Sequence, residues 1–557
     1  MKIKKPFVIS LLLAFFVLSG LSAQQWGDYY FYSIQNSNKA YLLDNNGSTY
    51  HTWTFPSADK TGYSSYLLPG GDLLRTVKYT PNSFAGGGQT GKLQKTDWEG
   101  NVIWDFVYAT TSYAMHHDIC PMPNGNVLLI AYELKTAAQA TLAGSAQSII
   151  IWSEKIVEVR QTGATSGEVV WEWHLWDHLV QSHDPSKNNY VSSISDHPER
   201  LNINYKTSKD WIHMNGIDYN PILDQIIFSS HNLNEIYVID HSTTTQEAAT
   251  GSGGFSGKGG DFLYRWGNTV AYGMGGTAVF NVVHDSHWIP ENCPNGGRLV
   301  AFNNKGISNT KSSVDQVSAP LNGFNYTYTA GTAYQPLSYT ERHACNGGSN
   351  SMGGSQQLPN GNMLVCVATS GLIYEVNSVG TTIWSKTLSG VCPKAYKYNA
   401  CYLNGSIPVI PVITIADNTL VCDEVASYQW YFNGVLMPGE VNRTLTPVTG
   451  GVYGVRTSDS DDCMFSYSAL LAFDVTTSIN NIYKSDLIKI YPNPGSDIVS
   501  IETQLQVSGV SVCDLTGRNF DIAVKEKALD VSELPSGIYI LAISTSSGTI
   551  TKKLVRH

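Results

Sequence analysis

The chain has 557 residues, of which 42% are hydrophobic and 14% charged, and its formal net charge is −10. This balance excludes an extended disordered chain, and the acidic charge argues against a general nucleic-acid-binding protein, whose surface needs a basic stripe. Fifty Gly, 32 Tyr and 13 Trp residues are typical of many short strands joined by tight turns.

The first 23 residues have the pattern of a secretory signal peptide. The basic start MKIKK is followed by the apolar run Val8–Leu18 and by small residues that end in Ala23. We therefore predict that residues 1–23 are a signal peptide cleaved after Ala23. An uncleaved membrane anchor is the alternative, but the run is short for a spanning helix, and no later segment is apolar enough to cross a bilayer.

A degenerate repeat fills residues 24–404. One half of each unit is a strand, a Pro-Gly or Pro-Asn-Gly turn and a second strand, as in Tyr63–Thr76 and His116–Glu133. The other half is a hairpin with a glycine turn and a Trp in its second strand, as in Leu42–Phe55 and Leu93–Phe106. About six such four-stranded units fit this length, which predicts a six-bladed β-propeller. A β-solenoid or two stacked sandwiches are the alternatives.

The pattern of residues 405–478 predicts a separate immunoglobulin-like β-sandwich. Their central strand, Tyr428–Phe432, carries a Trp and ends at an Asn-Gly turn, with Cys422 before it and Cys463 after it. Export permits disulfides, so we consider two bridges, Cys422–Cys463 and Cys392–Cys401. Sequence alone does not fix the pairing of the nine cysteines.

The C-terminal segment, residues 482–557, alternates in polarity as a small β-sandwich does. Its ordered motifs, IKIYPNPGSDIVSIE, VCDLTGR, LDVSELPSGIYIL and the basic end TKKLVRH, resemble the C-terminal sorting domain of the type IX secretion system. The resemblance implies that the secretion machinery is a partner of this chain. It also implies that the mature protein is secreted or attached to the cell surface.

Several histidines stand beside the turns of the repeat, and all of them except His231 lie at the head of the strand that leads into the turn. They are His116-His117, His213, His231, His284 and His287. Equivalent positions of successive propeller blades point toward one central channel. We therefore expect these imidazoles, although far apart in sequence, to converge.

The same motifs resemble the bacterial arylsulfate sulfotransferases over roughly residues 30–400. They are MHHDI, WIHMNGIDYN, FLYRWGN and VVHDSHW, in this order. The resemblance implies a six-bladed propeller that moves a sulfuryl group from a phenolic sulfate donor to a phenolic acceptor. It further implies a covalent histidine intermediate, no nucleotide donor and no cofactor. No GxxxxGK[ST] phosphate loop occurs in the chain.

Individual roles follow from matching each motif. His284 corresponds to the family's nucleophile, and His117 and His213 correspond to two further catalytic histidines. The family has an arginine after a pair of serines where this chain has His231, so His231 could take over that contact. Arg265 and Arg342 are alternative sources of the fixed charge, and His287 is a candidate for the rim of the site.

Two other functions fit the same scaffold. The chain could be a non-catalytic surface propeller that binds a glycan or a protein, which the missing arginine favours slightly. It could also be a metal-dependent hydrolase with His117, Asp118, His284 and His287 as ligands, because imidazole and carboxylate suit zinc. The sequence does not identify the natural donor or acceptor.

Overall fold

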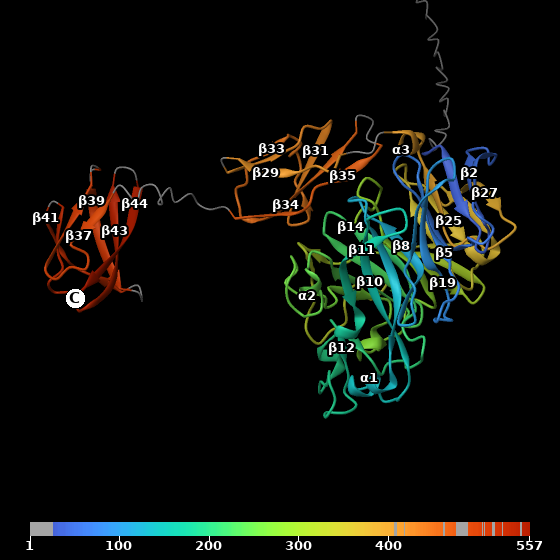
Figure 1. Cartoon of the computed structure of the whole chain (residues 1–557), viewed down its shortest axis with the longest axis horizontal. Helices are drawn as coiled ribbons and strands as arrows, with labels where there is room; N and C mark the ends of the chain where they lie inside the picture. The colour runs from blue at the N-terminus through green and yellow to red at the C-terminus, as the bar shows by residue number, and fades with distance from the viewer. Residues whose placement is uncertain are drawn as a thin grey trace, which may run out of the picture. The chain divides into compact units, whose positions relative to one another are not determined.

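The computed structural model describes residues 26–405, 409–416, 418–459, 463–474, 488–503, 505, 507–514, 518–525, 527–545 and 548–557. Nearly all regular structure in these ranges is β-strand (Figure 1), which confirms the predicted all-β class. None of the helices in these ranges is long and apolar enough to cross a membrane. The predicted signal peptide lies outside the described residues.

Residues 29–398 form six four-stranded antiparallel sheets. The first sheet has the order β28-β1-β2-β3, with β28 (Ala395–Tyr398), β1 (Tyr29–Ser33), β2 (Lys39–Asp44) and β3 (Thr49–Thr54). The second and third are β4 (Thr61–Leu67), β5 (Leu73–Lys78), β6 (Gly91–Thr96) and β7 (Val102–Val107), then β8 (Tyr113–Pro121), β9 (Val127–Lys135), β10 (Ile151–Gln161) and β11 (Gly167–His174). The fourth is β14 (Met214–Asn220), β15 (Gln225–Ser230), β16 (Glu235–Asp240) and β17 (Tyr264–Trp266). The last two are β18 (Val283–Trp288), β19 (Leu299–Ser308), β20 (Lys311–Val317) and β23 (Glu341–Ala344), then β24 (Gly354–Gln357), β25 (Met363–Val367), β26 (Leu372–Val376) and β27 (Thr382–Thr387).

The six sheets follow one another in a closed ring. The strand β1 contacts β4, β4 contacts β8, β8 contacts β14, β14 contacts β18, and β18 contacts β24. The strand β24 contacts β28, which pairs antiparallel with β1. The last strand of this region therefore completes the first sheet. The first strands of successive sheets are consequently the ones brought closest together.

The tryptophans of the repeat connect neighbouring sheets through hydrogen bonds. The indole N–H of Trp53 in β3 donates to the carbonyl oxygen of Asp97 in the next sheet, at 3.2 Å. Trp104 in β7 donates to Ser166, and Trp173 in β11 to Gly260, at 3.0 and 2.8 Å. These indoles are almost fully buried. The repeated Trp thus has a physical reason, because each ring adds apolar area and satisfies one backbone carbonyl.

Short elements decorate the sheets. They are the helices α1 (Ala137–Leu142), α2 (Thr245–Ala248) and α3 (Ala400–Asn404), the 3-10 turns η1 (Leu175–Asp177), η2 (Ile194–Asp196), η3 (Thr269–Tyr272) and η4 (Ala368–Ser370), and the strand pairs β12 (Leu179–Val180) with β13 (Leu201–Asn202) and β21 (Leu321–Asn322) with β22 (Asn325–Tyr326). The capping boxes that begin α1 and α2 are built on Thr136 and Thr244.

The segment after residue 405 contributes two further sheets. One contains β29 (Ile413–Ala416), β30 (Thr419–Cys422) and β33 (Thr444–Leu445); the other contains β31 (Ser427–Phe432), β32 (Val435–Leu436), β34 (Gly451–Ser458) and β35 (Phe465–Tyr467), with β36 (Leu471–Phe473) beside β34. Trp430, at the centre of β31, is fully buried. The immunoglobulin-like assignment of this segment stays a prediction.

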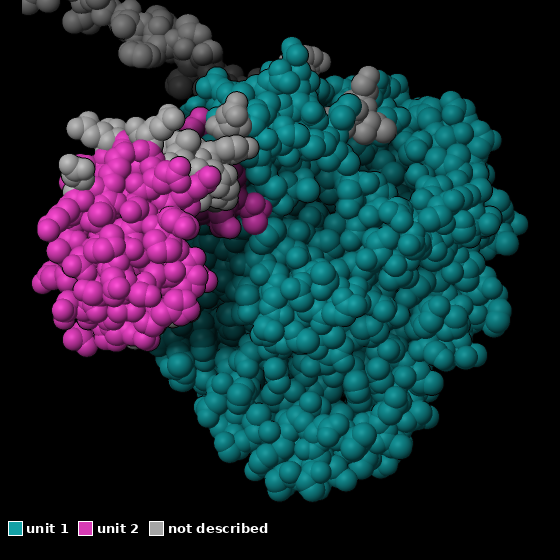
Figure 2. All heavy atoms as spheres, turned by 60° about the vertical axis from the view of Figure 1, so that its left-hand side comes forward, with its two compact units in different colours: residues 1–445, 452–471 teal, residues 446–451, 472–557 magenta. Residues whose placement is uncertain are grey.

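The chain divides into two compact units, residues 1–445 with 452–471 and residues 446–451 with 472–557 (Figure 2). The predicted domain limits stay predictions. The second unit holds two four-stranded sheets, made of β37 (Lys489–Tyr491), β38 (Ile498–Glu502), β42 (Ala528–Asp530) and β41 (Ala523–Lys525), and of β40 (Asn519–Phe520), β39 (Val507–Asp514), β43 (Gly537–Thr545) and β44 (Gly548–Arg556). Their apolar sides share one core that includes Val499, Leu529 and Leu541.

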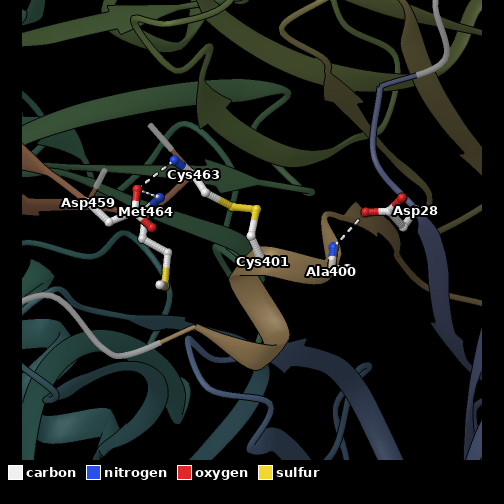
Figure 3. Close-up of a disulfide and its surroundings, with 6 residues drawn as sticks. All are labelled: Asp28, Ala400, Cys401, Asp459, Cys463 and Met464. Carbon is white, nitrogen blue, oxygen red and sulfur yellow. Dashed lines mark hydrogen bonds between the residues drawn. A yellow bond between two sulfur atoms is a disulfide. The ribbon is translucent and has the colours of Figure 1, made fainter. Parts of the chain in front are cut away.

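One disulfide joins Cys401 in α3 to Cys463 before β35, with 6.2 Å between the two Cα atoms (Figure 3). Cys392 and Cys422 are buried free thiols, so both predicted bridges, Cys392–Cys401 and Cys422–Cys463, are wrong. Sequence proximity misled the prediction. The Cys392 carbonyl instead accepts from the thiol of Cys366, at 3.1 Å.

Removing the disulfide is expected to destabilise the first unit by about 2–4 kcal/mol, because the bridge closes a long loop in the unfolded chain. The two cysteines are 62 residues apart. Cys401→Ser should lower the denaturant midpoint, measured by tryptophan fluorescence, whereas Cys513→Ser, which changes an unbridged thiol, should not. An unchanged midpoint in Cys401→Ser, or a non-reducing peptide map that pairs Cys401 with Cys392, would contradict the assignment.

Candidate active site

Four of the predicted histidines meet. The ring centroids of His117 and His213 are 4.7 Å apart, those of His213 and His231 are 5.0 Å apart, and those of His231 and His284 are 5.6 Å apart. The four residues, called here the histidine cluster, come from β8, the start of β14, the end of β15 and β18. They converge because they occupy the same end of first strands, or a neighbouring position, in adjacent sheets.

Irregularities of the backbone orient these four imidazole rings. His117 and His213 have left-handed backbone conformations, with φ of 49° and 56°. The strand registers shift between Met115 and Ile119, between Met214 and Gly216, and between His284 and His287. Bulges of this kind redirect a side chain out of the alternation of a regular strand, and left-handed non-glycine residues cluster at functional sites.

His284 is held in one neutral tautomer. Its Nδ1 lies 2.7 Å from Oδ1 of Asn304, whose Nδ2 donates to the carbonyls of Ser349 and Met352 at 2.9 and 2.7 Å. The amide oxygen can only accept, so Nδ1 of His284 carries the hydrogen. The Nε2 atom accepts from the backbone N–H of Met352 at 3.1 Å. Burial lowers the pKa of His284 well below 6.5, so Nε2 keeps a lone pair at neutral pH.

His213 and His231 are positioned in the same way. Nδ1 of His213 lies 2.7 Å from Oδ2 of Asp210, and Nδ1 of His231 lies 2.8 Å from Oδ1 of Asn232. Burial raises the pKa of Asp210, but the interactions with His213, His116 and Tyr132 together outweigh burial and leave this pKa below its usual value. Burial lowers the pKa of His231.

A buried carboxylate–imidazole chain leads to His117. Oε2 of Glu154 lies 2.8 Å from Nε2 of His116, and Nδ1 of His116 lies 2.8 Å from Nδ1 of His117. The His116 ring stacks on Tyr132 with 3.6 Å between centroids. Glu154 is fully buried and also accepts from the N–H of Met214 at 3.0 Å. Burial raises the pKa of Glu154 and lowers the pKa values of His116 and His117.

Sequence reasoning missed Glu154, Asp210 and Asn304. Glu154 lies in β10, whose first nine residues are all buried. Ser153 and Lys155 flank it, so the strand pattern did not distinguish Glu154 as a buried carboxylate that needs a partner.

A glycine loop lies directly over two rings of the cluster. A Cβ atom on Gly88 would lie 2.2 Å from the His117 ring, and one on Gly87 would lie 2.5 Å from Cε1 of His213. The N–H of His117 donates to the carbonyl of Gly88 at 2.7 Å. No side chain larger than hydrogen fits at these two positions without moving the imidazoles.

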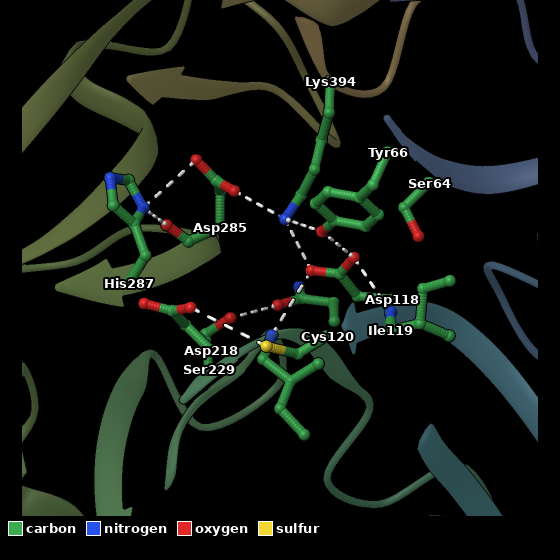
Figure 4. A network of polar contacts seen from close by, with 12 residues as sticks. Ser64, Tyr66, Asp118, Ile119, Cys120, Asp218, Ser229, Asp285, His287 and Lys394 are labelled. Carbon is green, nitrogen blue, oxygen red and sulfur yellow. Dashed lines mark hydrogen bonds and ion pairs between the residues drawn. The ribbon is translucent and has the colours of Figure 1, made fainter. Parts of the chain in front are cut away.

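Beside the cluster lies an ion-pair network (Figure 4). The Lys394 ammonium contacts carboxylate oxygens of Asp118 and Asp285 at 2.5 and 2.6 Å. The Tyr66 hydroxyl donates to Asp118 at 2.7 Å, and the N–H of Ser355 donates to Asp285 at 2.9 Å. Each aspartate directly follows a cluster histidine in sequence. The network therefore fixes β8 and β18 where they carry His117 and His284.

Three other predicted site residues bond to groups outside the cluster, and their roles stay predictions. Arg265 is fully buried, with two bonds to Glu235 at 2.9 and 2.5 Å and two to backbone carbonyls. Arg342 makes two bonds of 2.6 Å to Asp315. Both guanidinium groups lie in the outermost strands, β17 and β23, and form ion pairs. His287 bonds through Nδ1 to the carbonyl of Asp285 at 2.9 Å, on the side of the Lys394 network.

The predicted zinc ligands do not form a site. Asp118 is engaged by Lys394, and Nδ1 of His287 by the carbonyl of Asp285. Within the described residues, no group of three or more His, Cys, Asp or Glu side chains could hold a metal ion.

The arylsulfotransferase (ASST) family model matches residues 19–396 of this chain, well over half of its length. The chain belongs to the arylsulfotransferase family. The motifs that carry the sequence resemblance contain three histidines of the cluster, His117, His213 and His284. Membership in the arylsulfotransferase family therefore supports a sulfotransferase.

A second family model, the secretion system C-terminal sorting domain, matches residues 489–557. This finding confirms the predicted type IX sorting domain of this arylsulfotransferase family member and supports export to the outer-membrane surface or the medium. No functionally curated protein matches the chain.

Three solved structures illustrate distant likenesses to this chain. A protein of unknown function from Bacteroides caccae has a TM-score of 0.36 at 11% identity, covering 66% of this chain and 98% of that one. A streptogramin B lyase has a TM-score of 0.30 at 12% identity, covering 65% and 84%. The Cps50 (Swd1) β-propeller domain from Myceliophteria thermophila has a TM-score of 0.30 at 8% identity, covering 66% and 88%.

Proposed function

We propose that this chain is an exported arylsulfate sulfotransferase that carries the sulfuryl group on His284 and uses no nucleotide donor. The observation that supports this most is the meeting of His117, His213, His231 and His284 in a chain that belongs to the arylsulfotransferase family. We further propose that the six sheets of residues 24–404 are the blades of a propeller, followed by an immunoglobulin-like sandwich over residues 405–478.

The proposed reaction has two half-reactions. In the first, the Nε2 lone pair of His284 attacks the sulfur of the phenolic sulfate, and the bond between sulfur and the phenolic oxygen breaks with its electron pair on that oxygen. In the second, the acceptor oxygen attacks the same sulfur, and the nitrogen–sulfur bond breaks with its electron pair returning to Nε2. Throughout, Asn304 accepts from the Nδ1–H of His284 and holds the ring in place. The Met352 N–H leaves Nε2 when the donor binds and faces the sulfuryl oxygens instead.

The chain Glu154–His116–His117 is the proposed proton relay. When Glu154 is protonated and donates to Nε2 of His116, Nδ1 of His116 donates to Nδ1 of His117, and Nε2 of His117 carries a hydrogen for the leaving phenoxide. Its transfer shifts two protons along the chain and leaves Glu154 ionised. His117 then presents a lone pair that accepts the proton of the acceptor phenol, and the chain returns to its first state. The raised pKa of Glu154 and the lowered pKa values of both imidazoles suit this neutral resting state.

The sulfuryl oxygens are proposed to be held by His213 and His231. The contact of Nδ1 with the carboxylate of Asp210 fixes the orientation of the His213 ring and leaves Nε2 free to face an anionic oxygen. The Lys206 ammonium donates to the carbonyl of Asn232, next to His231, at 2.5 Å. Lys206 thus brings a positive charge near His231, which stands where the family has its arginine.

The test is an assay with 4-nitrophenyl sulfate as donor, with and without phenol and with and without a chelator. Release of nitrophenol that depends on phenol and resists the chelator is the expected result. Release that the chelator abolishes would instead support the hydrolase. The absence of release across several donors and acceptors would remove the enzymatic proposal and leave a surface-binding protein.

We expect kcat/KM for the donor to fall on acidification only below pH 6.5. Because the pKa of His284 is lowered from 6.5, its lone pair survives as the pH falls from 7 through 6.5 and is lost only at more acidic pH. The kcat/KM for the donor, which reports the free enzyme, is expected to stay level in that window. A half-maximal value at or above pH 6.5 would contradict a buried neutral nucleophile.

A further inference from the structure

A second cavity lies farther along the same first strands that carry the histidine cluster. Its volume is about 270 Å³, and its wall includes Tyr66, Asp218, His287, Trp288 and Tyr396. Asp218 is five residues after His213 in sequence, and His287 is three residues after His284. Lys394 and Asp285 of the ion-pair network lie in the wall of this cavity (Figure 4), and Asp285 directly follows His284 of the cluster in sequence.

The electrostatics of this cavity are dominated by carboxylates. The Lys394 ammonium is fully engaged by Asp118, Asp285 and the hydroxyl of Tyr66, the last at 3.3 Å. Asp218 forms no ion pair within the described part of the chain. Its Oδ2 accepts from the N–H of Trp288 at 2.9 Å, and its Oδ1 meets the thiol of Cys120 at 3.8 Å. Asp218 and Asp285 line the cavity beside a single ammonium, Lys394, which Asp285 and Asp118 already engage. The carboxylate of Asp218 is therefore left to favour a positively charged occupant.

Burial raises the pKa of Asp218, and the charge of His287 opposes that effect only in part. A carboxylate in this position gains from any cation that replaces the lost water. Its side chain remains partly accessible from the cavity.

The rest of the wall is aromatic. Tyr66, Trp288 and Tyr396 all line the cavity, and aromatic faces attract organic cations. A larger cavity of about 700 Å³ shares Asp218 and Trp288 with the first one and continues past the apolar side chains of Ile222, Leu223 and Leu436. A ligand with a charged head and an apolar body matches this change from carboxylate to aromatic and then apolar side chains along the two cavities.

We propose that this cavity binds a primary ammonium compound with an aryl or alkyl body, with the ammonium on Asp218 and the body against Trp288. The excess of carboxylates disfavours anions, so this ligand is distinct from a sulfate ester. The proposed site is also independent of sulfuryl transfer, because it uses none of the four histidines.

The test is calorimetric titration of the whole mature chain with 2-phenylethylamine, 2-phenylethanol and phenylacetate. The amine is expected to bind at least about tenfold more tightly than the alcohol, with no binding of the anion. The near-isosteric change Asp218→Asn should weaken amine binding by about tenfold or more. Asp72→Asn, which alters another half-buried carboxylate whose pKa burial raises, should leave it unchanged.

Further variants separate this site from the transferase. His284→Asn should abolish transfer and leave amine binding intact, whereas failure of the transfer assay would say nothing against binding. If Asp218→Asn does not fold, Trp288→Leu should still weaken the amine more than the alcohol. Equal affinities for amine and alcohol, or full amine affinity in folded Asp218→Asn, would overturn the proposal.

Discussion

Replacement of His284 by asparagine or glutamine is expected to lower turnover by roughly 10³-fold or more, because the nucleophile carries the sulfuryl group between the two substrates. Both replacements keep a side chain that can hydrogen-bond to Asn304, so the fold should survive. The measurement is kcat with 4-nitrophenyl sulfate and phenol, accompanied by circular dichroism and a thermal midpoint.

His343→Gln is the matched control for this change. His343 lies in β23, and its Nε2 is 2.8 Å from the hydroxyl of Tyr374, away from the cluster. Its loss should leave kcat within a small factor of wild type. Full activity of a folded His284→Asn variant would remove the proposed nucleophile.

The second large effect is expected for Glu154→Gln, with kcat lowered by about 10²–10⁴-fold. A glutamine amide can donate to Nε2 of His116 as protonated Glu154 does, but it cannot release that proton. Proton transfer along the relay would stop, so His117 could neither supply a proton to the leaving oxygen nor accept one from the acceptor. The change removes no volume, so packing around Tyr132 should be preserved.

The dependence on the leaving group distinguishes a relay from a structural role. Phenyl sulfate expels a basic phenoxide and needs the proton, whereas 4-nitrophenyl sulfate expels a weaker base and needs it less. In Glu154→Gln, the first half-reaction should therefore slow more for phenyl sulfate than for 4-nitrophenyl sulfate. An equal slowing for both donors would contradict proton transfer through Glu154.

Glu158→Gln is the control on the same strand. Glu158 lies in β10 four residues after Glu154, and its Oε2 is likewise in contact with an imidazole nitrogen, Nε2 of His241, at 3.1 Å. That pair is remote from the four clustered rings. This variant should lose some stability but keep its kcat and its leaving-group dependence.

The repeat predicted the all-β class and the meeting of His117, His213, His231 and His284, because equivalent positions of repeated units become neighbours in a closed ring. The tryptophans in the second hairpin of each unit also indicated a repeat, and in the structure their indoles donate to carbonyl groups of the adjacent sheet. Other features depend on distances that a repeat does not encode. Glu154 has no equivalent in the motifs, so its contact with His116 could be found only from the structure.

The sequence did not indicate the partners of charged groups and cysteines, for one reason. Arg265 and Arg342 were predicted to contact substrate from their charge, and the buried carboxylate partner of each, Glu235 or Asp315, was not foreseen. A charged residue in a short strand does not reveal on which side of the sheet its partner lies. The cysteine pairing failed likewise, because Cys401 is closer in space to Cys463 than its position in the chain suggests.

The most direct test of the account is to mix the mature chain with 4-nitrophenyl sulfate alone and map the modified residue by mass spectrometry under non-acidic conditions. The account predicts one added SO₃ group on the peptide that contains His284, removed when phenol is added and absent in His284→Asn. A stable adduct on another residue, or rapid turnover with no adduct at any time, would contradict it.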